Sequence, residues 1–224
     1  MAIVPISYFS DVLCVWAFIA QLRVDEVKSA FDGQVCLELR FCSVFGDTAR
    51  KIATQWGDKG GYDGFNAHLM HAVEAFPEVT LNPDIWRAVR PASSTGPHLF
   101  LKAAQVAEDR RQVSKGTAEK AMWAMRNAFF RDARDIGRWE VQRQVAAQVD
   151  ADIGAIEALI RDGSAFAALA SDYQDANSMG VQGSPTFVLN DGRQKLYGDV
   201  GYKIIEANIQ ELIRDPHPDH ASWC

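Results

Sequence analysis

The sequence predicts an α/β fold that is interrupted by a large all-helical segment. Strand-type patterns occur near the two ends of the chain, whereas the long stretch between them carries helical periodicity. The chain has 224 residues, of which 48% are hydrophobic and 23% charged. A chain of this size can bury a sizeable core, as one large domain or as two small ones.

The first 46 residues predict a strand, a helix and a second strand. Residues 3–9 form a short apolar run, and a helical pattern follows until Asp32-Gly33. Residues 35–41 alternate between apolar and polar side chains, which is the period of a half-buried strand. Such a unit is normally a right-handed parallel crossover whose strands end at the same edge of the sheet, so chemistry is expected at that edge.

Residues 47–178 are predicted to be a helical insertion domain. Helical periodicity covers four segments of it, residues 97–108, 117–134, 140–149 and 153–161.

Residues 179–224 are predicted to complete the first domain. Two short strands, 186–190 and 194–197, form a hairpin, and an amphipathic helix follows them. Pro216 ends this helix before a polar C-terminal tail. The order of elements is therefore that of a thioredoxin fold with a large all-helical insertion between the second and third strands.

Composition excludes several classes of function. The net charge is -6 and no run of Lys and Arg is present, so no nucleic acid is expected as a partner. No stretch reaches transmembrane length and the first ten residues do not resemble a signal peptide, so we expect a cytoplasmic protein with no membrane association. The four cysteines are too few and too scattered for a disulfide scaffold, so any disulfide is expected to be catalytic or transient.

Cys14 is the candidate catalytic residue. It follows the first predicted strand and lies near the first turn of the next helix. Unpaired N–H groups and the helix dipole stabilise a thiolate at such a place, so the sequence predicts a lowered pKa for Cys14. The alternative is a buried structural cysteine, but the position favours a functional role.

Pro185 is the second feature of interest. Ser184-Pro185 comes directly before the strand predicted over residues 186–190. A proline at the start of a strand is ordinary and most X-Pro bonds are trans, so this signal is weak when taken alone.

Together, two segments resemble the signature segments of DsbA-like thioredoxin-fold proteins. They are residues 10–18, SDVLCVWAF, and residues 180–187, GVQGSPTF. The middle of the chain also resembles the helical domain of that family, in the segment PASSTGPH over residues 91–98 and in Phe129-Phe130 with Gly137 downstream. The resemblance covers nearly the whole chain.

This resemblance implies roles for particular residues. Cys14 would attack a disulfide, and Pro185 would be the cis proline that follows the substrate-binding loop. The residues expected to bind the substrate or glutathione are Ser10, Trp16, Gly183, Ser184, Pro185 and Asp199.

The chain departs from the family pattern at Ala17, where the second cysteine of a Cys-x-x-Cys motif would stand. A monothiol forms a mixed disulfide but cannot release it through its own motif. Glutathione, Cys42 and Cys224 are the candidate resolving thiols. Cys42 ends the second predicted strand at the same edge as Cys14, although we favour a small core residue there. Cys224 is either an exposed resolving thiol or incidental to a disordered tail.

Three functions compete on these observations. The first is a thiol-disulfide oxidoreductase that acts through Cys14. The second is a glutathione-dependent enzyme, because the chain is also similar to kappa-class glutathione transferases and 2-hydroxychromene-2-carboxylate isomerases, in which a serine stands at the position of Cys14. Asp199 and Ser184 would then hold glutathione. The third is a non-catalytic thioredoxin-like binding module.

We expect no tightly bound cofactor and no metal, with glutathione as a cosubstrate of a thiol or disulfide substrate. His217, His220 and Cys224 have metal-like spacing, but two histidines and one thiol on a proline-containing tail make a poor site. A homodimer is the assembly that base rates favour.

Overall fold

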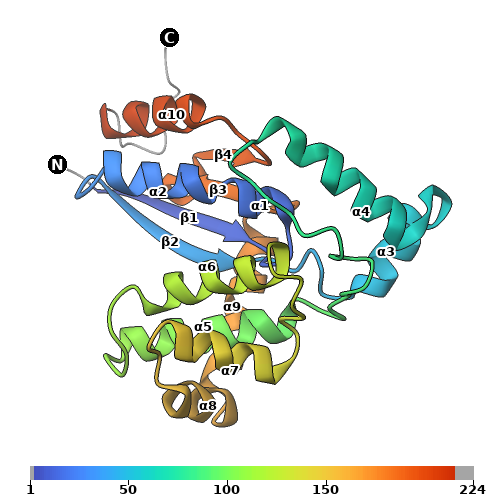
Figure 1. Cartoon of the computed structure of the whole chain (residues 1–224). Coiled ribbons are helices and arrows are strands. Elements are labelled where there is room, and N and C mark those ends of the chain that lie inside the picture. The colour runs from blue at the N-terminus through green and yellow to red at the C-terminus, as the bar shows by residue number, and fades with distance from the viewer. Residues whose placement is uncertain (1–2, 215–224) are drawn as a thin grey trace. The chain divides into compact units, whose positions relative to one another are not determined.

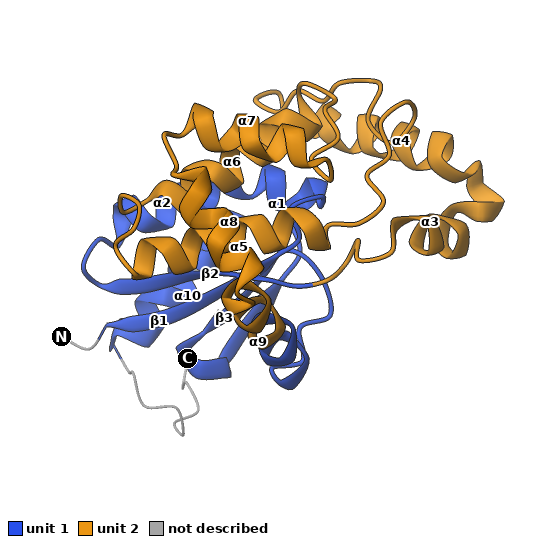
Figure 2. Cartoon of the chain, turned by 90° about the horizontal axis from the view of Figure 1, so that it is seen from below, with its two compact units in different colours: residues 1–42, 172–224 blue, residues 43–171 orange. Residues whose placement is uncertain are grey.

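The computed structural model describes residues 3–214. These residues belong to two compact units, shown in blue and orange in Figure 2. The first unit comprises the chain up to Cys42 and again from Asp172 onward, and the second comprises Ser43–Ser171. Figure 1 shows the elements in chain order.

The first unit is built on a mixed four-stranded sheet in the order β2-β1-β3-β4. Its strands are β1 (Val4–Ser10), β2 (Val35–Phe41), β3 (Thr186–Leu189) and β4 (Gln194–Tyr197). β1 and β2 are parallel, whereas β3 runs antiparallel to both β1 and β4. This is the sheet of a thioredoxin fold, and the fold class predicted from the sequence is confirmed.

Three helices complete the part of the first unit that adjoins these strands: α1 (Val15–Ile19), α2 (Gln21–Ala30) and α10 (Tyr202–Arg214). The sequence pattern predicts one continuous helix after β1, but the structure has two, which meet at Ala20. Val24 and Val27 carry the buried side of α2, while Leu22 is 51% exposed.

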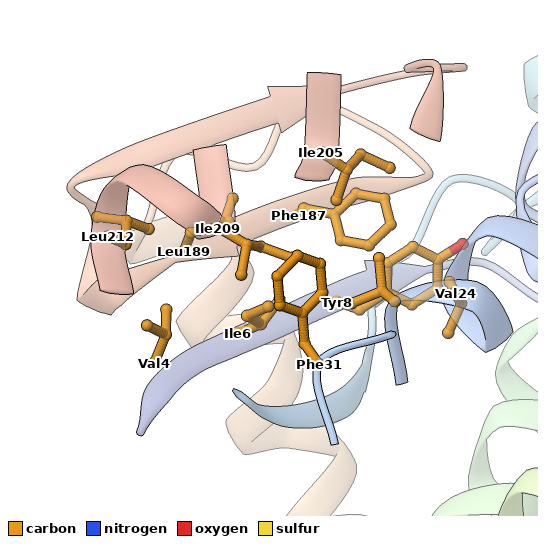
Figure 3. Close-up of a cluster of buried hydrophobic side chains, with 11 residues drawn as sticks. Val4, Ile6, Tyr8, Val24, Phe31, Phe187, Leu189, Ile205, Ile209 and Leu212 are labelled. Atoms are coloured by element: carbon orange, nitrogen blue, oxygen red, sulfur yellow. The ribbon is translucent and has the colours of Figure 1, made fainter. Parts of the chain in front are cut away.

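The core of this unit lies between the sheet, α2 and α10 (Figure 3). Alternate residues of β1 point into it, as the period of two requires. Tyr8 packs on Phe187 of β3 with ring centroids 4.6 Å apart. The buried cluster consists of Val4, Ile6, Tyr8, Val24, Val27, Phe31, Phe187, Leu189, Ile205, Ile209 and Leu212.

The second unit is helical, as the sequence predicts. Its helices are α3 (Thr48–Trp56), α4 (Gly61–Ala72), α5 (Thr95–Asp109), α6 (Thr117–Phe130), α7 (Trp139–Gln148) and α8 (Ile153–Arg161). Its core includes a cluster of aromatic rings. Trp86 stacks on Phe45 with ring centroids 5.2 Å apart and meets Phe129 edge to face at 5.0 Å. The helix predicted over residues 117–134 ends earlier, at Phe130, and Ala133 beyond it has a φ of 48°.

The last helix of the insertion, α9 (Ser164–Ser178), is shared between the two units. From Asp172 onward it belongs with the sheet, because the Asp172 carboxylate accepts the N–H of Phe41 at 3.0 Å and Asp175 pairs with Arg40. The second boundary therefore falls within this helix, whereas the sequence analysis placed it at the end of the helix, between residues 178 and 179. Along the part of the chain that the structure describes, no helix is long and apolar enough to cross a membrane.

Two isoleucines of α10 provide a test of this packing. Ile209 is completely buried, whereas Ile204 on the same helix is 54% exposed. Ile209→Ala should lower the free energy of unfolding by about 2–5 kcal/mol, because it removes buried methyl groups and leaves a cavity. Ile204→Ala should change it by no more than about 0.5 kcal/mol. Chemical denaturation of both variants measures the two values, and equal effects would contradict the described orientation of α10.

Candidate active site

Cys14 lies in a tight turn between β1 and α1. The turn begins with Asp11, whose carboxylate Oδ1 accepts the N–H of Leu13 at 2.9 Å and whose carbonyl accepts the N–H of Cys14 at 3.0 Å. Cys14 is the N-cap residue of α1 and has an extended backbone, with φ -85° and ψ 119°. The thiol is therefore held at the junction of strand and helix where the sequence analysis expected it.

The loop before β3 faces this turn. The Cys14 thiol donates to the carbonyl oxygen of Ser184 at 3.1 Å, and the N–H of Asp11 donates to the Ser184 hydroxyl at 2.8 Å. The Ser184–Pro185 peptide bond is cis. Two segments that are 170 residues apart in sequence are thus joined by two hydrogen bonds at Ser184.

Cys42 lies at the same edge of the sheet. It follows the last residue of β2, and its N–H donates to the carbonyl of Ser10 at 3.2 Å. Its Sγ is 3.8 Å from the carbonyl oxygen of Gly183. The sulfurs of Cys14 and Cys42 therefore contact the carbonyl groups of two consecutive residues in one loop. Both cysteines are 5% exposed.

Burial raises the pKa of the Cys14 thiol above its ordinary value. Hydrogen bonds from the Ser184 side chain and from the backbone of Ala17 and Trp16 lower this pKa, and the negative charge of Asp11 raises it further. The lowered pKa that the sequence analysis expected is therefore wrong. The N-terminal N–H groups of α1 do act on Cys14, but removal of the thiolate from water outweighs them.

The pKa of Cys42 is also raised. Burial is the largest cause, and the charges of Asp11 and Cys14 add to it. Both thiols are therefore protonated at neutral pH.

Four of the other expected binding residues lie close to these groups. Ser10 is buried at the end of β1, and its carbonyl holds Cys42. Gly183 and Pro185 flank Ser184 in the loop, and Trp16 is half-buried in α1. That these residues bind glutathione or another thiol stays a prediction.

The remaining expected residues are placed differently. Asp199 follows β4 and forms an ion pair with Arg23 of α2. This ion pair links α2 to the segment after β4 within the first unit. The role of Asp199 in binding glutathione also stays a prediction. Cys224, His217 and His220 lie outside the described residues.

Asp11 is a site residue that the sequence analysis did not single out. Its side chain shapes the turn that presents Cys14, its backbone binds Ser184, and its charge acts on both buried thiols. It is also completely buried. The signal was available, because an acidic residue that interrupts an apolar run three residues before the motif cysteine is unusual unless its carboxylate is hydrogen-bonded inside the fold.

These features define a thioredoxin-fold protein with one thiol at the head of the first helix, opposite a proline loop at the start of an antiparallel strand. A family model, DSBA-like thioredoxin domain, matches residues 5–210 of the sequence. The chain belongs to this family.

Solved structures agree with this assignment of the fold. A probable DsbA oxidoreductase from Streptomyces coelicolor is 18% identical with a TM-score of 0.73, and the match covers 98% of this chain and 94% of that one. The cytosolic disulfide reductase DsbM from Pseudomonas aeruginosa, solved with GSH, is 18% identical with a TM-score of 0.65 and coverages of 92% and 99%. A 2-hydroxychromene-2-carboxylate isomerase is 15% identical with a TM-score of 0.64 and coverages of 95% and 97%. The comparison with curated proteins finds no match.

The raised pKa of Cys14 predicts slow alkylation at neutral pH. Exposed Cys36 should react with iodoacetamide before buried Cys14, and the Cys14 rate should keep rising above the pH of about 8.5 at which an ordinary thiol titrates. Peptide mapping by mass spectrometry over a pH series gives both rates. The same protein in denaturant is the control, since there the two thiols should behave alike. A Cys14 that reacts faster than Cys36 at pH 7 would show that its thiolate is stabilised after all.

Proposed function

We propose that the chain is a thiol-disulfide oxidoreductase in which Cys14 attacks a disulfide substrate and reduces it. The observation that carries this proposal is the hydrogen bond between the Cys14 thiol and the carbonyl of Ser184, directly before the cis peptide bond to Pro185. In this arrangement the attacking sulfur lies beside a loop with backbone groups that can align an extended thiol partner. Membership of the DSBA-like family supports the same class of chemistry.

The first step is a thiol-disulfide exchange. Cys14 loses its proton, and its sulfur attacks one sulfur of the substrate disulfide, so that a mixed disulfide forms and the other half of the substrate leaves as a thiolate. A second thiol then attacks the mixed disulfide, and the remaining half of the substrate is released. With glutathione as this second thiol, Cys14 becomes glutathionylated, and a further glutathione frees Cys14 and leaves as glutathione disulfide.

The electrostatics of the site favour the reducing direction. A strong thiol oxidant stabilises its reduced form, usually as a thiolate with a low pKa. Here burial and the charge of Asp11 raise the pKa of Cys14 instead, so no such stabilisation drives oxidation of a partner. A reducing compartment with abundant glutathione, such as the cytoplasm, would keep the site in its working form.

Glutathione is the proposed cosubstrate. Ala17 stands where a second motif cysteine would resolve the mixed disulfide. A thiol from outside the motif is therefore needed to release Cys14 from it. The related disulfide reductase from P. aeruginosa was solved with GSH, which supports a thiol of this kind for the fold.

Substitution of Cys14 tests the proposal. Cys14→Ser should abolish glutathione-dependent reduction of a small disulfide such as hydroxyethyl disulfide, because a hydroxyl does not exchange with disulfides. The assay couples glutathione disulfide production to NADPH oxidation by glutathione reductase. Cys36→Ser, which removes an exposed thiol of β2, should retain activity. Full activity in Cys14→Ser would refute the proposed function.

A second function is favoured by one observation, the burial of a Cys14 thiol that donates a hydrogen bond. A buried thiol that keeps its proton can donate a hydrogen bond to the sulfur of bound glutathione, as a serine would in a glutathione-dependent isomerase or transferase. Cys14→Ser distinguishes the two functions. This variant should keep isomerase or transferase activity, which Cys14→Ala should lose, whereas both variants should lose disulfide reduction.

A further inference from the structure

We propose that Cys42 is the second redox-active thiol of this site, so that Cys14 and Cys42 form a disulfide between neighbouring strand ends in place of one within a single motif. This inference rests on the proposed function, because it names the thiol that resolves the mixed disulfide at Cys14. In the attack on the mixed disulfide, Cys42 takes the place of the first glutathione.

The backbone brings the two cysteines to the same place. Ser10 pairs with Phe41 at the end of the parallel ladder, and the N–H of Cys42 continues it by donating to the Ser10 carbonyl at 3.2 Å. The chain forms a tight turn directly after β1, because the N–H of Cys14 donates to the Asp11 carbonyl at 3.0 Å. Cys14 therefore stays at the edge of the sheet where β1 and β2 end.

The side chains converge on one loop. The Cys14 sulfur is 3.1 Å from the carbonyl oxygen of Ser184, and the Cys42 sulfur is 3.8 Å from that of Gly183. These are consecutive peptide groups, and the two thiols are near enough for the charge of one to act on the other.

The other described cysteine cannot take this role. Cys36 pairs with Pro5 near the start of the ladder, six residues before Cys42. At about 3.3 Å per residue this places it about 20 Å away along the strand, far beyond the Cα separation that a disulfide spans. Of the three described cysteines, Cys42 alone shares an edge with Cys14.

The step balances without an added oxidant. Cys14 in a mixed disulfide with the substrate is attacked by Cys42, which gives up its proton, and the second half of the substrate leaves and is protonated. The products are one reduced substrate, as two thiols, and one Cys14–Cys42 disulfide. Two molecules of glutathione then restore both thiols and leave as glutathione disulfide.

Burial limits the rate of the second step. It is the largest cause that raises the pKa of Cys42, and the negative charge of Asp11 adds to it. We therefore expect attack by Cys42 on the mixed disulfide to be slow at neutral pH.

The test follows oxidised species in full-length protein. The reference is Cys224→Ser, which removes the terminal thiol, and it is compared with Cys224→Ser/Cys42→Ser and with the matched control Cys224→Ser/Cys36→Ser. Each reduced protein is treated with glutathione disulfide, quenched with acid over time, and analysed by intact mass and by peptide mapping. The reference and the Cys36 control should lose both thiol hydrogens and yield a linked Cys14–Cys42 peptide. The Cys42 variant should instead accumulate one glutathionyl group on Cys14.

The alternative outcomes separate this inference from the proposed function. A stable glutathionyl group on Cys14 in all three proteins would overturn the role of Cys42 and leave Cys14 as a monothiol oxidoreductase. No modification of Cys14 in any protein would refute both. The linked peptide is sought in proteins that retain Cys42, so it decides the question even if Cys42→Ser folds poorly. The Cys42→Ala variant, which removes the buried hydroxyl, should show the same glutathionyl adduct.

Discussion

The arrangement of strand ends is the constraint on which the rest of the site depends. β1 and β2 are parallel, so their carboxyl ends meet at one edge, and β3 is antiparallel to β1, so its amino end meets them there. Cys14, Cys42 and the loop ending in Pro185 each follow or precede one of these three strand ends. The N–H of Asp11 then links the turn after β1 to the loop before β3 by donating to the Ser184 hydroxyl.

The charge state of Cys14 is decided by two opposing effects of different size. A helix N-terminus stabilises an anion by about 0.3–1 kcal/mol, and α1 has only five residues to supply that effect. Full burial of an ionisable group can shift its pKa by up to about 3–5 units, and each unit corresponds to about 1.4 kcal/mol. Cys14 is 5% exposed, so burial prevails and the thiol stays protonated. A cysteine at a helix start is therefore not reactive by position alone.

The groups next to the two sulfurs disfavour a free thiolate. The Cys14 sulfur contacts the carbonyl oxygen of Ser184, and the Cys42 sulfur contacts that of Gly183. The negative charge of Asp11 raises the pKa of both thiols. A carbonyl oxygen accepts a hydrogen bond from a protonated thiol but offers no donor to a thiolate.

The sequence by itself determined the order of the elements, because periods of two and of 3.6 residues are local properties of the chain. Residues 35–41 and 194–197 were predicted at the observed bounds of β2 and β4, and the helical insertion was predicted as a whole. Cys14 could be selected because the end of a strand and the start of a helix are also visible locally. Ser184 was selected through the resemblance of residues 180–187 to a signature segment of the family. The break at Ala20 and the division within α9 could not, since they depend on which side of each helix finds a partner. Tertiary structure alone decided the direction in which the pKa of Cys14 is shifted, because burial is set by residues that are distant in sequence.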